Sequence, residues 1–512
     1  MQHDPSRLAI VGGGSVAVSF LYQFLAAWPE GRALEVAIFE PRQEVGPGSA
    51  YQADLASNLL NIPVNRMSAV ATEPDSFMDW LRARDPAWLQ AHGVQAIEPS
   101  AFLPRPVFGS YLRDLYGQAL ACAQRKGVAV RRVAQAAVGV WPLASGQAAV
   151  LGAGGERVVA SRVVLCNGNL PSVAFPDLAP LPGYFNSPYP VADLCGRIGR
   201  DDTVCIVGTS LSAIDAIAAL RAQGHRGQVH CVSRNGRLPA VRSPHNTKVS
   251  LPALPEPEPD GRVTLDGLLD SLRRALRAAG GAEDHEDILG LAGPAGAALD
   301  AEIARSQAGP RPWQSVAAAT NDRIEHIWHA LDDAERRRFH RDWRTLWMAR
   351  RATFPMRNAL TLQQSLHEGR LHVHGGFRSA RYDAASGAFM VESGEGQVLS
   401  APWLVNATSF SMDVEASADP LVRQLCGQGQ ARAHALGGFD LDFATGCLLD
   451  RDGRRVPQVS VLGSLAAGTY FWTTSMEVNA RLAQGQAVRL ASECALDAVP
   501  ASVLPNSGFL AS

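Results

Sequence analysis

The sequence predicts an α/β protein made of two Rossmann-like dinucleotide-binding domains, each a three-layer unit around a parallel sheet. Two glycine-rich turns predict the two domains, because each turn joins an apolar strand to a helix, one from Gly12 and one from Gly208. Strand-rich stretches at 128–169 and 371–409 have the pattern of β-meander excursions that leave a parallel sheet and return to it. Between them, residues at about 245–355 have helical periodicity and predict a helical insertion in the second domain.

The first glycine-rich turn follows a short apolar strand. Gly12 permits the sharp turn, Gly14 has no side chain to block a pyrophosphate, and Ala17 is small enough for close packing of helix against strand. Ser15 opens the helix, whose free N–H groups and dipole favour a phosphate. Glu40 ends the next strand, where its carboxylate can hold both hydroxyls of an adenosine ribose and repels a 2′-phosphate. An ordinary glycine turn is the alternative, but the flanking strand and Glu40 favour a bound dinucleotide.

The loops after Glu40 are rich in small residues and are the natural place for the distal end of that dinucleotide, here a flavin ring. Arg105 stands between two prolines, and we expect it to reach a phosphate or a substrate carboxylate. Late in the chain, a helix over 476–490 is expected to direct its positive dipole end toward the flavin. The alternatives are a surface loop, a surface arginine and a helix without ligand contact. The candidate contacts are Gly48, Asn61, Arg66, Met67, Arg105, Gly463 and Thr474.

The second glycine-rich turn starts at Gly208, and its second strand ends at Ser233 and Arg234, to which Arg237 adds a further charge. A hydroxyl and a guanidinium at this place suit a ribose 2′-phosphate, so the sequence predicts NADP(H) here and FAD at the first turn. Ser210 replaces the middle glycine of the fingerprint, and its side chain limits the approach of a pyrophosphate. A vestigial, purely structural fold is therefore the alternative.

Length and composition restrict the other function classes. A chain of 512 residues predicts two or three domains, and the net charge of −2 gives no reason to expect nucleic acid or an anionic membrane as partner. No membrane-spanning apolar run and no signal peptide are present, so we expect a cytoplasmic protein. None of the eight cysteines forms a Cys-x-x-Cys pair, which excludes disulfide reductases, and no residue spacing suggests a metal site.

These features divide the chain into four parts. Residues 1–195 are the first part of the FAD-binding domain, and residues 196–370 are the NAD(P)-binding domain with its insertion. Residues 371–495 are expected to return to the FAD-binding domain, and 496–512 form a loose tail without periodicity.

Several of these motifs together resemble the bacterial FAD-NAD(P)-binding protein family and, more distantly, the flavin monooxygenases of the N-hydroxylating type. They are found in residues 12–17 with Glu40, 46–51, 60–68, 104–111, 208–215 and 233–236. The resemblance implies FAD on the first fold, NAD(P)H on the second and reaction at the flavin between them. The sequence departs from the family at Ser210, and also at residues 167–168 and 408–409, where Ala-Thr-Gly is usual.

Motifs and resemblance together favour an FAD-dependent, NADPH-using oxidoreductase, a monooxygenase that uses O2 on a small, amino-bearing metabolite. No catalytic side chain and no oligomeric state is identified. A flavin oxidase or dehydrogenase that leaves the second fold unused is the first alternative, and Ser210 favours it. A non-catalytic flavin-binding partner protein, with the helical insertion as its binding surface, is the second.

Overall fold

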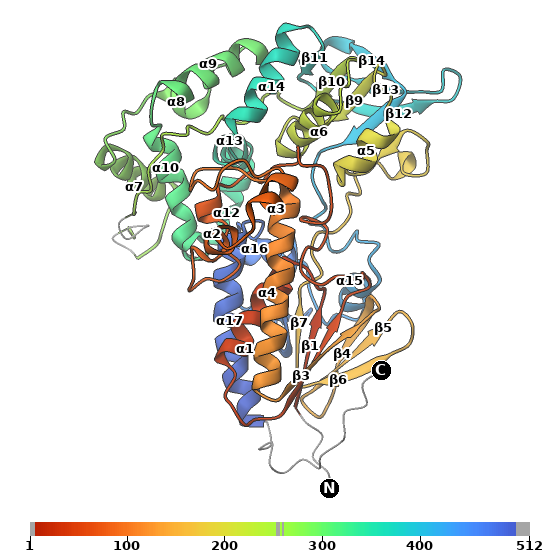
Figure 1. Ribbon diagram of the computed structural model, residues 1–512, viewed down its shortest axis with the longest axis vertical. Coiled ribbons are helices and arrows are strands. Elements are labelled where there is room, and N and C mark those ends of the chain that lie inside the picture. Colours follow the sequence, from red (N-terminus) through yellow and green to blue (C-terminus); the bar gives the residue numbers. More distant parts are fainter. Residues whose placement is uncertain (1–5, 252–256, 259–260, 498–512) are drawn as a thin grey trace.

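The computed structural model describes residues 6–251, 257–258 and 261–497. Two parallel sheets lie in different parts of the molecule, the first beside three long helices and the second near the far end of the longest axis (Figure 1). The expected tail at 496–512 lies outside the described residues from 498 on, and so does most of the proline-rich stretch at 252–260. Within the described part of the chain, no helix has the length and apolar character needed to cross a membrane.

The first sheet has six strands in the order β16-β17-β7-β1-β2-β3. The five strands from β17 to β3 run parallel, and only the edge strand β16 is antiparallel. β1, β2 and β7 are mostly buried apolar runs, as expected for a sheet covered on both faces. The strands are β1 (Ser6–Val11), β2 (Leu34–Phe39), β3 (Val128–Val133), β7 (Arg162–Leu165), β16 (Cys447–Leu449) and β17 (Arg455–Val461).

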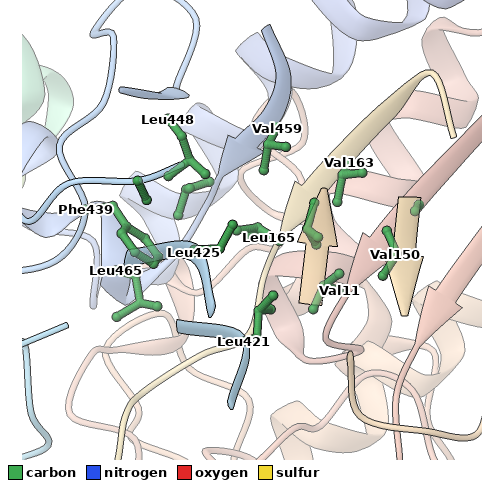
Figure 2. Close-up of a cluster of buried hydrophobic side chains, with 14 of the residues drawn as sticks. Val11, Val150, Val163, Leu165, Leu421, Leu425, Phe439, Leu448, Val459 and Leu465 are labelled. Atoms are coloured by element: carbon green, nitrogen blue, oxygen red, sulfur yellow. The ribbon is translucent and has the colours of Figure 1, made fainter. Parts of the chain in front are cut away.

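Side chains alternate between the two faces of this sheet and bury a different layer on each. Leu8 and Ile10 pack under the helices α1 (Ser15–Ala27), α4 (Arg105–Arg125) and α17 (Met476–Asp497). Val11 faces the opposite way, where Figure 2 shows it in one cluster with Leu165, Val150 and Leu421. That layer is formed by α15 (Pro420–Gly427) and a small antiparallel sheet, β4 (Ala137–Pro142), β5 (Ala148–Gly152) and β6 (Arg157–Ala160).

The second sheet repeats this plan with five parallel strands in the order β11-β10-β9-β15-β8. Helices α5 (Val191–Arg197), α6 (Leu211–Ala222) and α14 (Met356–His367) pack on one face. The antiparallel strands β12 (Ser379–Asp383), β13 (Ala388–Glu392) and β14 (Val398–Ala401) cover the other. The parallel strands are β8 (Tyr184–Phe185), β9 (Val204–Val207), β10 (Val229–Val232), β11 (Leu371–His374) and β15 (Trp403–Asn406).

The strand order differs from the expected division of the chain at residue 371. β11 pairs with β10, and β15 pairs with β9, so both extend the second sheet. β8, which precedes the expected boundary at 195, also lies in this sheet beside β15. The chain re-enters the first sheet only with β16 and β17. The reason is that the second strand-rich excursion returns to the sheet from which it left, as the first one does with β7.

The helical insertion lies between β10 and α14, where the sequence predicts it. Its helices pack beside the second sheet and over the end of α17 (Figure 1). They are α7 (Leu265–Ala278), α8 (His285–Leu289), α9 (Ala295–Ala308), α10 (Pro312–Ala319), α11 (Ile324–Ala330), α12 (Asp333–Arg338) and α13 (Arg344–Arg351). Three short helices complete the described chain: α2 (Ser76–Arg82), α3 (Pro86–Ala91) and α16 (Ala467–Tyr470).

Candidate functional site

A cavity of about 1520 Å³ brings the candidate contacts together, although they are spread over most of the chain. All of them except Ala17 line it. Ala17 is 2% exposed and packs in the core between α1 and the first sheet, so its small size serves helix packing and not ligand contact. The lining candidates are Gly12, Gly14, Ser15, Glu40, Gly48, Asn61, Arg66, Met67, Arg105, Gly208, Ser210, Ser233, Arg234, Gly463 and Thr474.

The first glycine turn is as narrow as a pyrophosphate cradle needs to be. Gly12 has φ +93°, and a Cβ there would lie 2.4 Å from the Cys166 carbonyl oxygen, so no side chain fits. Gly48 has φ +56°, and a Cβ on it would lie 3.1 Å from Gly14 Cα. Gly14 is also the N-cap of α1. Because it has no side chain to cap the helix, the first backbone N–H groups are left for a ligand.

Glu40 lies beside this turn and is 5% exposed. Its Oε2 accepts a hydrogen bond of 2.8 Å from Gly13 N, and its Oε1 accepts one of 2.9 Å from Arg42 N. A carboxylate has about four acceptor positions, so both oxygens keep a lone pair for ribose hydroxyls. The side chain therefore fixes the turn and can hold a ribose at the same time.

The far end of the cavity contains buried polar atoms without a partner. Asn61 Oδ1, Thr473 Oγ1 and Ser475 Oγ make no hydrogen bond within the described residues. Buried polar groups are nearly always paired, so these atoms indicate a ligand with a polar edge. Gly463, with φ +91°, and the first turn of α17 line the same cavity. A flavin ring fits this chemistry, and the glycine cradle fits the rest of FAD.

The second glycine turn repeats the backbone geometry of the first. Gly208 has φ +125°, and a Cβ there would lie 2.5 Å from the Ala407 carbonyl oxygen. Ser210 is the N-cap of α6 in extended backbone and makes no side-chain cap bond. Ser233 holds the following loop, because its Oγ lies 3.0 Å from Thr209 Oγ1 and accepts a 3.0 Å bond from Gly236 N.

Cations surround the loop after β10. Arg234 and Arg237 are exposed and line the cavity, as the sequence suggests. Arg344, at the start of α13, lines it as well, and sequence reasoning missed it. Burial and the positive charge of Arg234 lower the pKa of Arg344, which means that the two guanidinium groups are near each other. No local motif marks Arg344, because only the packing of the insertion brings it to this loop.

Arg105, which the sequence predicts to reach a phosphate or a substrate carboxylate, lines the cavity and also contacts polar groups of the protein. Its Nη2 lies 3.3 Å from Asp215 Oδ2, and its Nε donates to Asn58 Oδ1 at 3.0 Å. Tyr189 donates a 2.6 Å bond to the same Asp215 oxygen. Asp215 is fully buried on α6, so Arg105 takes part in a buried ion pair between the first domain and the second.

Cysteine and metal chemistry find no support in the cavity. No disulfide bond joins cysteines within the described residues, and burial raises the pKa of Cys166, which lines the cavity, so that its thiol stays protonated. In the described part of the chain, no group of histidine, cysteine and carboxylate side chains could hold a metal ion.

Comparisons with known proteins agree with this geometry. Residues 9–170 match a family model described as FAD-NAD(P)-binding, which confirms the resemblance over that region. L-lysine 6-monooxygenase from Pseudomonas syringae superposes with a TM-score of 0.57 at 15% identity, covering 96% of this chain and 100% of that one. The reduced form of ornithine hydroxylase from Pseudomonas aeruginosa gives 0.58 at 14% identity, covering 96% and 99%.

A third similar structure is the FAD-bound cadaverine monooxygenase of desferrioxamine biosynthesis from Erwinia amylovora. Its TM-score is 0.50 at 12% identity, covering 100% of this chain and 99% of that one. A search of curated protein sequences gave no match. At such identities the likeness shows the fold, and it confirms the predicted two-domain Rossmann-like architecture.

Proposed function

We propose that the chain is an FAD-dependent, NADPH-using monooxygenase that acts on a small metabolite with O2 as its second substrate. The observation that carries the proposal is a single cavity lined by two glycine turns, which have side chains of opposite charge beside them. Glu40 stands at the first cradle, and Arg234 and Arg344 stand at the second. An acidic group selects a ribose with free hydroxyls and basic groups select a 2′-phosphate, so the two cradles suit FAD and NADPH.

The chain's own residues bind and orient these groups. Gly12, Gly14, Gly48 and Glu40 hold the adenosine half of FAD, and the residues around Asn61 and at the N-terminus of α17 hold its flavin end. FAD, when bound, supplies the redox chemistry. The α17 N-terminus carries a partial positive charge and favours negative charge on the ring. Because both cradles open into one cavity, the protein can also keep water away from the place where the cofactors meet.

The similar structures support a monooxygenase and suggest a first substrate class. They are described as a lysine, an ornithine and a cadaverine monooxygenase, all of which act on amine-bearing compounds. We therefore propose an amino-bearing metabolite as the substrate. The cytoplasmic location expected from the sequence stays a prediction.

Anaerobic reduction of the purified protein tests the proposal. The protein should be yellow, and NADPH should bleach the flavin absorbance much faster than NADH. Arg234→Gln should raise the NADPH concentration for half-maximal reduction about tenfold, the equivalent of ~1.4 kcal/mol, and change the NADH value less than twofold. Arg226→Gln is the matched control, because Arg226 forms an exposed ion pair with Asp201 away from the cavity. An unchanged preference in Arg234→Gln would remove Arg234 from the nucleotide site.

A flavin oxidase or dehydrogenase is the second candidate, and Ser210 favours it. The side chain of Ser210 stands where the fingerprint usually has its middle glycine. Bleaching by an amine or a hydroxy acid, with none by NADPH or NADH, would support this candidate. Inertness to every donor would instead support a non-catalytic flavin-binding protein.

A further inference from the structure

Three arginines converge on the flavin end of the cavity from distant parts of the chain. Arg66 follows the first-domain loops, Arg242 follows the loop after β10, and Arg351 ends α13. A backbone bridge between Val241 and Phe354 brings the latter two segments together. Burial and the positive charges of Arg242 and Arg66 lower the pKa of Arg351 to about 9. Burial and the charge of Arg66 lower the pKa of Arg242 to about 10.

The positive charge of this arginine cluster (Arg66, Arg242 and Arg351) is only partly balanced. Glu477, at the start of α17, lies 3.1 Å from Arg66 Nη2 and accepts a 2.9 Å bond from Asn321 Nδ2. Asn321 Oδ1 in turn accepts a 2.8 Å bond from Arg351 Nη2. Within the described ranges, no ion pair involves Arg242 or Arg351. Three guanidinium groups therefore share one carboxylate, and two positive charges have no counter-charge.

A neighbouring buried cluster shows how such charges are balanced when their role is structural. Arg311 and Arg350 both contact Glu302, and Arg311 also contacts Asp287. Two guanidinium groups there meet two carboxylates. Arg66, Arg242 and Arg351, by comparison, have only the Glu477 carboxylate within the described residues.

Donor atoms at the arginine cluster also lack partners. Arg242 Nε and Arg351 Nε make no hydrogen bond to any residue that the structure describes, although Arg351 is only 9% exposed. The hydroxyl of Thr353, which is 4% exposed, likewise has no partner within the described residues and lines the same cavity. Buried cations without counter-charge and buried donors without acceptors are both costly, and an anion supplied by a ligand removes both costs.

We propose that the arginine cluster binds the anionic part of the substrate, and that the substrate is a small organic acid with two carboxylates. This inference rests on the proposed function and narrows its substrate class. Guanidinium groups form paired hydrogen bonds with carboxylates, and two carboxylates match the two uncompensated charges. Thr473 and Ser475 flank Thr474, the residue predicted to contact the flavin, so the bound acid lies near the reacting end of FAD. An amino group on the same molecule is compatible with this cluster, whereas a simple diamine is not.

Ligand titration of the FAD-loaded protein tests the inference without turnover. The probes are succinate, glutarate and sulfate, with 1,4-diaminobutane as the cationic comparator, and binding is followed by calorimetry and by the flavin difference spectrum. Succinate or glutarate should bind and the diamine should not, whereas binding of sulfate alone would contradict a substrate with two carboxylates. Arg242→Gln and Arg351→Gln should each raise the Kd of the dicarboxylate that binds tenfold or more, while the exposed control Arg226→Gln leaves it within twofold.

The same variants separate the substrate from the nucleotide. The Kd of NADP⁺ should stay within twofold in Arg242→Gln and Arg351→Gln and should rise in Arg234→Gln. If the first two variants weaken NADP⁺ binding, or if no anion binds more tightly to the wild type than to Arg351→Gln, the inference is overturned. Failure of the proposed function appears elsewhere, as a flavin that NADPH does not bleach, and calorimetric anion binding to the FAD-loaded protein does not depend on that result.

The melting temperature of the ligand-free protein distinguishes a ligand-binding role of Arg351 from a structural one, because the two roles predict different effects of Arg351→Gln. Without ligand, Arg351→Gln removes an uncompensated buried charge and should leave Tm unchanged or raise it. Added succinate, glutarate or sulfate should raise Tm of the wild type and not that of the variant. A marked fall in Tm of the ligand-free variant would show that Arg351 serves the fold, and it would overturn the inference.

Discussion

The carboxylate of Glu40 has two roles. It fixes the first glycine turn through Gly13 N and Arg42 N, and in the proposed site it also holds the ribose of FAD. Glu40→Gln puts an amide NH2 against one of these backbone donors, so we expect a loss of ~1–3 kcal/mol of stability and a Kd for FAD at least tenfold higher.

Fluorescence titration of the flavin-free protein with FAD measures this loss. Glu44→Gln is the matched control, because Glu44 lies four residues on in an exposed pair with Arg113. Equal FAD affinity in Glu40→Gln and the wild type would remove Glu40 from the ribose site.

Single residues were predictable where their role is set by neighbours along the chain. Gly12 and Gly208 were recognisable because a sharp strand-to-helix turn requires the positive φ that both have. Arg351 and Arg344 were not recognisable, because each is one of many arginines in a helical insertion. Their roles follow from the lack of an ion pair within the described residues and from their closeness to a distant loop, and local sequence shows neither.

The helical insertion is held together by the charge network around Glu302 on α9. Arg311 Nη1 donates to Glu302 Oε2 at 2.6 Å, and Arg350 Nη2 donates to Oε1 at 2.7 Å. Burial alone would raise the pKa of Glu302, but the hydrogen bonds and charges of Arg311 and Arg350 outweigh it and lower the pKa. Glu302→Gln leaves two buried guanidinium groups without their shared carboxylate, and the insertion should lose about 3–5 kcal/mol of stability.

Hydrogen exchange of α9 and α13 and urea unfolding measure this effect. Because the pKa of folded Glu302 is depressed, its contribution is fully present above the ordinary glutamate pKa of about 4.3 and is lost as the pH falls through the lower folded value. The wild type should therefore lose this stability on acidification, and Glu302→Gln should lack this part of the pH dependence. Glu286→Gln is the control on the same insertion, because Glu286 is exposed in its pair with Arg305. Equal protection of the two variants would contradict the role of the network.

On the scale of the whole molecule, the sequence predicts two folds but not how they meet. Hydrophobic runs and glycine turns along the chain indicate both sheets, because these signals are local. The assignment of β11 and β15 to the second sheet depends on strand pairing, which the run of residues alone does not determine. The contacts between domains are also invisible in the sequence, since Arg105 and Asp215 stand 110 residues apart.

These contacts form one buried junction. Asp54 of the first domain accepts bonds from Val191 N at 3.0 Å and Ala192 N at 2.9 Å at the start of α5, and Arg105 reaches Asp215 on α6. Asp215 has no exposed surface, and burial raises its pKa although the charge of Arg105 acts the other way. The pair thus stabilises the junction only while both members are present.

A double-mutant cycle on this pair tests whether it sets the position of the two domains. Arg105→Gln or Asp215→Asn alone leaves one buried charge unpaired and should cost about 3–5 kcal/mol, whereas the double variant should recover much of that loss. Hydrogen exchange at residues 186–191 should rise in each single variant and fall again in the double variant, because these residues lead from β8 into α5 and include Tyr189, which donates to Asp215. Strictly additive free energies of unfolding, with unchanged exchange at 186–191, would mean that the cofactor cavity keeps its shape without this ion pair and owes its geometry to the apolar packing on either side.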